Sequence, residues 1–168
     1  KRFSATDRDE RRAFDLVELT PQQVTALAVT TGPGSFTGGR IGISTVKGIG
    51  LGLAAPPAVV GLPTLTVTAA LWLALAAAVT PAPRICAYIQ AGRGRYNWAW
   101  FTAGELLARP AAADHHAGTA AEFTAALADV AGPVWLAGED GADLSAAVAP
   151  LPHVCTPHAV STLRRAGP

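Results

Sequence analysis

The chain has no methionine, only two cysteines and few charged side chains. Asp, Glu, Lys and Arg make up 15% of its 168 residues, hydrophobic residues make up 50%, and the formal net charge is +1. This balance lacks the single-sign field of a protein that binds nucleic acid unaided. The apolar content excludes a disordered chain. Because Lys1 is not an initiator residue, we expect a truncated or processed N-terminus.

Cysteine chemistry and membrane insertion are also disfavoured. Cys86 and Cys155 are far apart and form no CxxC motif, which is typical of small buried hydrophobes in a reducing compartment. The longest apolar run, Ala69–Val79, has 11 residues, whereas a membrane span needs about 18 or more. No signal peptide is recognisable. We therefore predict a cytoplasmic protein without a membrane partner.

The charges are unevenly distributed along the chain. Ten of the 25 charged residues lie in 1–18, and 19–83 contains only Arg40 and Lys47. Apolar β-branched runs separated by Gly and Pro favour an α/β fold with helices covering a sheet. Prolines near residue 82 predict a boundary between a first lobe, 1–83, and a second lobe, 84–168.

Local patterns predict the individual elements. Strands are expected over 27–31, 59–61, 84–90, 96–101, 134–136 and 153–155, and helices over 40–53, 64–79, 119–130, 143–148 and at the C-terminus. Thr64 and a Thr119/Glu122 capping box are expected to start two of these helices. In the predicted helix 64–79, the residues expected to face the core are Leu71, Trp72, Leu75 and Val79. In the predicted helix 40–53, the four-residue spacing of Ile41, Thr45, Ile49 and Leu53 predicts a face that packs closely against another element.

A glycine-rich segment between a predicted strand and a predicted helix is the sharpest motif. It contains Gly32, Pro33, Gly34, Ser35, Phe36, Thr37, Gly38, Gly39 and Arg40. Such a turn can hold a phosphate against free backbone N–H groups. Its spacing, however, fits neither GxxxxGK[ST] nor GxGxxG. A structural turn in which Ser35 or Thr37 caps the helix is the favoured interpretation, and an anion site stays open as the alternative.

Other polar residues do not form a recognisable catalytic set. His115 and His116 are adjacent and lack the spacing of a metal motif, so we expect them in a solvated loop and predict no metal. Cys155, His153 and His158 have no orienting acid nearby in the sequence. Ser35 does not lie in a GxSxG elbow. We predict no catalytic residue.

Basic and aromatic residues are combined in a predicted hairpin. Arg93 and Arg95 lie in its turn, and Tyr96, Trp98 and Trp100 follow on one face of the next strand. That face is more typical of a core or an interface than of a base-stacking platform. Arg93 and Arg95, together with Lys47, stay candidates for contact with RNA or a partner.

The segment Thr31–Gly42, followed by Lys47-Gly48 and Val60–Thr64, resembles the signature of the TsaB (formerly YeaZ) family. These are glycoprotease-like proteins of bacterial tRNA threonylcarbamoyladenosine synthesis. The resemblance covers about 19–101. It implies an actin-like (ASKHA) fold of two RNase H-like lobes, of which the first lacks the family's opening strand. Gly39, Gln90 and Gly92 depart from the family pattern.

The resemblance also implies a function. It predicts a non-catalytic, cofactor-free subunit that pairs with a TsaD-type transferase and a TsaE-type ATPase, forms homodimers and meets tRNA only through the complex. An ATPase that uses the Gly32–Arg40 loop is the first alternative. ATP is expected as a ligand under that interpretation alone. A degenerate paralogue that merely self-associates is the second. Fold alone does not separate them.

Overall fold

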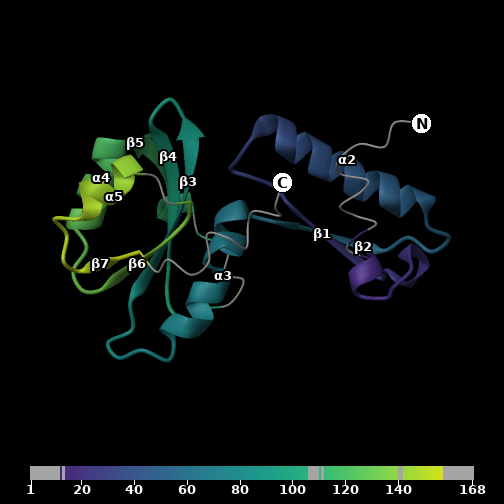
Figure 1. Ribbon diagram of the computed structural model, residues 1–168, viewed down its shortest axis with the longest axis horizontal. Coiled ribbons are helices and arrows are strands. Elements are labelled where there is room, and N and C mark those ends of the chain that lie inside the picture. The colour runs from purple at the N-terminus through teal and green to yellow at the C-terminus, as the bar shows by residue number, and fades with distance from the viewer. Residues whose placement is uncertain (1–11, 13, 106–109, 111, 140–141, 157–168) are drawn as a thin grey trace.

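The chain forms two separate β-sheets, and one helix connects the first sheet to the second (Figure 1). The computed structural model describes residues 12, 14–105, 110, 112–139 and 142–156. The predicted α/β class is confirmed, since helices and strands alternate along most of this length. None of the described helices is long and apolar enough to cross a membrane.

The first sheet has two parallel strands, β1 (Ala26–Thr30) and β2 (Ala58–Leu62). The short 3-10 helix η1 (Pro21–Gln23) precedes β1, and α2 (Phe36–Gly52) connects the two strands. A Cβ added at Gly42 would lie 3.4 Å from Val29 Cγ2, so this glycine brings α2 close to β1. The helix spans the length of the small sheet on one side (Figure 1).

The second sheet has five strands in the order β5-β4-β3-β6-β7. They are β3 (Arg84–Gly92), β4 (Arg95–Phe101), β5 (His115–Thr119), β6 (Val134–Ala137) and β7 (Val154–Cys155). The first three pair antiparallel, whereas β6 and β7 extend the sheet in parallel. The 3-10 helix η2 (Ala112–Asp114) leads into β5.

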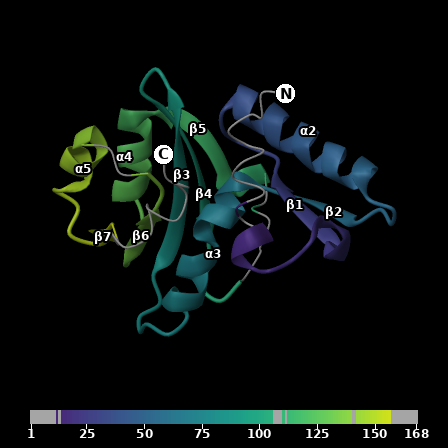
Figure 2. The same ribbon diagram turned by 45° about the vertical axis from the view of Figure 1, so that its right-hand side comes forward.

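Helices cover both faces of the five-stranded sheet (Figure 2). On one face α3 (Thr64–Ala76) packs against β3, and its Leu65, Ala69 and Leu73 join a cluster with Ile85 and Phe101. The opposite face carries α4 (Ala120–Ala128) and α5 (Ala142–Val148). There the second cluster includes Tyr88, Tyr96, Trp98, Phe123, Leu127 and Leu144. Each face therefore has a closed apolar core.

Two predicted helix faces are only partly confirmed. In α3 Trp72 is buried as expected, but Leu71 and Leu75, together with Val79 just beyond the helix, are 39–47% exposed. The face that packs against β3 is instead formed by Leu65, Ala69, Leu73 and Ala76 together with Trp72. In α2, Ile41 is 50% exposed, whereas Thr45, Ile49 and the C-cap residue Leu53 are partly buried and Val46 is the buried residue.

Three local predictions also need correction. His115 and His116 lie in β5 rather than in a loop, because pairing with β4 supplies hydrogen bonds that no local pattern reveals. Thr64 does not cap α3, whose N-cap is Pro63 without a side-chain hydrogen bond. Cys86 is buried, but Cys155 is exposed. The predicted C-terminal helix and His158 lie outside the described residues.

Candidate functional site

The glycine-rich loop connects β1 to α2. Its first residues form hydrogen bonds with the end of β2 and the start of α3. The Thr31 N–H donates to the Leu62 carbonyl at 2.9 Å, and the Thr64 N–H donates to the Gly32 carbonyl at 2.8 Å. Gly32 has a φ of 104°, a conformation that side-chain-bearing residues rarely adopt. The Gly32–Pro33 peptide bond is cis. The loop conformation is therefore set by its own backbone and by β2.

Ser35 caps the N-terminus of α2, as the sequence predicts. Its hydroxyl oxygen accepts a hydrogen bond from the Gly38 N–H at 3.1 Å, and its carbonyl accepts from the Gly39 N–H at 2.9 Å. Thr37 lies inside the first turn and is not the cap. The cap satisfies one of the N–H groups that a helix start leaves free.

The loop borders a pocket of about 510 Å³. Of the residues singled out in the sequence, all except Thr37 line it: Gly32, Pro33, Gly34, Ser35, Phe36, Gly38, Gly39 and Arg40, with Thr30, Thr31, Ile43 and Thr64. The Arg40 guanidinium lies 3.9 Å from the centre of the Phe36 ring. Among the described residues, the lining of the pocket thus combines the Arg40 cation, several hydroxyl groups and a helix start, without a carboxylate. This chemistry suits an anion.

The remaining basic candidates lie elsewhere. Lys47 is exposed on α2, and Arg93 and Arg95 are exposed at the tip of the β3–β4 hairpin in the other sheet. Next to that tip, hydrogen bonds from the backbone and then the side chain of Thr119 lower the pKa of Glu122, with a smaller contribution from Arg95. These contacts form the predicted capping box at the start of α4. The structure therefore brings the loop residues together and leaves the three cations apart from them.

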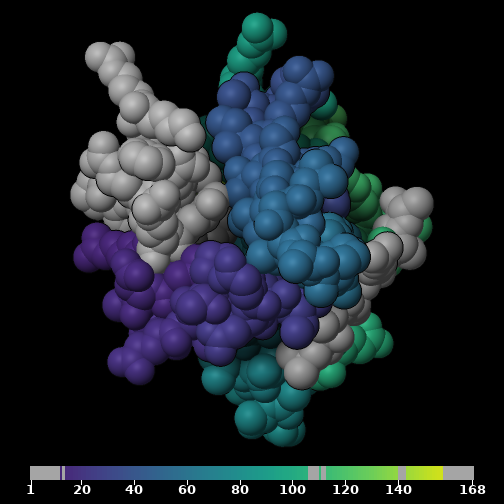
Figure 3. Space-filling model, turned by 90° about the vertical axis from the view of Figure 1, so that its right-hand side faces the viewer, coloured from purple at the N-terminus to yellow at the C-terminus, as the bar shows by residue number. Residues whose placement is uncertain are grey.

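Many large hydrophobic side chains are exposed in the part of the chain that precedes β3. We call apolar surface the exposed large hydrophobic side chains of α2, β2 and α3: Phe36, Ile41, Leu51, Val59, Val60, Val67, Leu71 and Leu75. Leu51 is 89% exposed and Phe36 is 72% exposed. Figure 3 shows α2 lying across the face of the molecule that looks away from the five-stranded sheet. No pattern in the sequence distinguishes these exposed hydrophobic residues from those that are buried in the core.

The described residues include no cluster of side chains that could bind a metal ion. No group of three or more His, Cys, Asp or Glu side chains is close enough to hold an ion there. His115 and His116 point to different sides of β5: the first is exposed, and the second packs on Trp98 with ring centroids 5.5 Å apart. His153 Nε2 lies 3.0 Å from the Leu127 carbonyl, in a structural contact.

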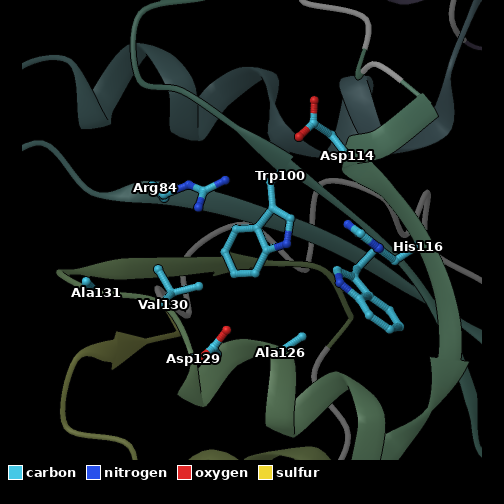
Figure 4. A pocket seen from close by; sticks show the side chains of 9 residues that line it. Arg84, Trp100, Asp114, His116, Ala126, Asp129, Val130 and Ala131 are labelled. Carbon is cyan, nitrogen blue, oxygen red and sulfur yellow. The ribbon is translucent and has the colours of Figure 1, made fainter.

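Sequence reasoning missed a second pocket, of about 520 Å³, beside the five-stranded sheet. Arg84, Trp98, Trp100, Asp114, His116, Ala126, Asp129, Val130 and Ala131 line it (Figure 4). The alternation of aromatic residues in β4 gave one signal for it. The residues contributed by η2, β5 and α4 gave none, because they meet β4 only in the folded chain.

Comparison with known proteins identifies the family. Residues 11–152 match the family described as TsaD, tRNA N6-adenosine threonylcarbamoyltransferase. YeaZ from Pseudomonas aeruginosa matches the structure with a TM-score of 0.55 and 25% sequence identity, over 77% of this chain and 56% of that one.

A second solved structure, an uncharacterized protein with similarity to peptidase YeaZ from Pseudomonas aeruginosa, has a TM-score of 0.56 at 24% identity and covers 80% of this chain and 60% of its own. The chain thus spans less than two thirds of either protein, and the second match supports the fold alone. No curated protein matches. These findings confirm the resemblance seen in the sequence, and the chain belongs to the TsaD family, with a fold like that of YeaZ.

Proposed function

We propose that the protein is a non-catalytic subunit in tRNA threonylcarbamoyladenosine synthesis that binds a TsaD-type transferase. Family membership supports the pathway. The observation that carries the proposed role is the apolar surface on α2, β2 and α3. Within the proposed complex a TsaE-type ATPase supplies nucleotide hydrolysis, and tRNA is met through the assembled subunits. The lobes 1–83 and 84–168 are part of the same proposal.

The exposed large hydrophobic side chains are concentrated in one part of the chain. Single exposed leucines are normal on a monomer, whereas a contiguous apolar patch marks an interaction site. All the exposed large hydrophobics among the described residues lie between Leu16 and Val79. Parallel strands are ordinarily covered on both faces, and a two-stranded sheet is marginal alone. A protein partner would supply the missing cover for β1, β2 and α2.

Binding to a TsaD-type transferase tests this role directly. The two proteins are mixed, and complex formation is measured by light scattering and calorimetry. Leu51→Glu places a charge in the apolar surface and is expected to weaken binding by about tenfold or more. Ala121→Glu, on the exposed side of α4, is the matched control and should bind like the unaltered protein.

Two results would refute the proposal. One is the absence of any complex with the transferase. The other is a complex that Leu51→Glu does not weaken. If the apolar surface instead joins two copies of this chain and excludes the transferase, the self-associating alternative is correct.

Nucleotide binding at the glycine loop is a second candidate, favoured by the pocket of about 510 Å³ that contains Arg40. Calorimetric titration with ATP and ADP decides it. Micromolar binding that is lost in Arg40→Ala and kept in Arg93→Ala would establish the loop as a nucleotide site. In the first proposal the loop is a structural turn. It therefore predicts that neither the unaltered protein nor either variant binds ATP or ADP.

A further inference from the structure

We draw no further inference here: the strongest candidate, the exposed outer edge of β1 in the two-stranded sheet, carries none because nothing in the structure shows what covers it.

Discussion

The two sheets of this molecule differ in how completely they bury their apolar side chains. The five-stranded sheet has a helix-covered cluster on each face. In the two-stranded region, residues 14–62, Val46 is the one buried hydrophobic side chain that the structure describes. The two-stranded region is nevertheless rich in apolar residues as well. The difference shows that apolar content produces a core only where enough strands and helices meet to enclose it.

This difference divides the molecule into a self-supporting part and a dependent part. Hydrophobic burial is the dominant favourable term in folding. We therefore expect the free energy of unfolding to come mainly from β3, β4, β6 and the helices that cover them. The two-stranded region should be stabilised by its hydrogen bonds to the start of α3 and by a partner that covers its exposed apolar side chains.

The largest expected effect separates the two regions through matched core and surface truncations. Phe123→Ala removes a fully buried ring that contacts Tyr88, Tyr96 and Trp98, and it should lower the free energy of unfolding by about 3–5 kcal/mol. Leu51→Ala should change it by less than about 0.5 kcal/mol. Urea denaturation followed by circular dichroism measures both. Equal losses would contradict the division.

Glycine substitutions sharpen the same contrast. A Cβ at Gly138 would lie 2.6 Å from the Tyr88 carbonyl oxygen, a backbone atom that cannot swing aside. Gly138→Ala should therefore cost about 1–3 kcal/mol. In α2 a Cβ at Gly48 meets nothing within 4 Å, and Gly48→Ala should stabilise the exposed helix by up to about 1 kcal/mol. A neutral Gly138→Ala would show that β6 is not tightly packed on β3.

The glycine loop provides a smaller effect that depends on backbone conformation. Gly32 has room for a side chain, but its φ of 104° is strained for any other residue, so Gly32→Ala should cost about 1–2 kcal/mol. Gly39→Ala, inside α2 and without a close neighbour, is the control and should be neutral or slightly stabilising. Thermal unfolding followed by fluorescence detects both. A harmless Gly32→Ala would mean that the loop is not rigid.

The smallest effect is a pH dependence at the start of α4. Hydrogen bonds from Thr119 lower the pKa of Glu122. The folded state thus favours the ionised form, so its contribution is complete above the unfolded pKa and is lost as the pH falls through the folded pKa. The difference in Tm between the unaltered protein and Glu122→Gln should shrink as the pH is lowered into that range. A difference that persists in strong acid would exclude the capping box as its source.

Sequence patterns predicted the local features well and the long-range ones poorly. The loop between β1 and α2, the Ser35 cap and the Thr119/Glu122 box depend on neighbouring residues, and all are present. The orientation of α3 depends on its packing against β3, which no pattern within 64–79 encodes. The stack of His116 on Trp98 depends on pairing between β5 and β4. The family signature added the family and a YeaZ-like fold, while neither the local patterns nor the signature predicted the pocket beside the five-stranded sheet.

Native-state hydrogen exchange, with and without a TsaD-type transferase, tests the division of the molecule most directly. The account predicts that amides of β1, β2 and α2 exchange much faster than those of β3, β4 and β6 in the protein alone. Adding the transferase should slow exchange in α2 and β2 and leave β3 unchanged. Equal protection of the two sheets in the protein alone, with no change on adding the transferase, would contradict the account.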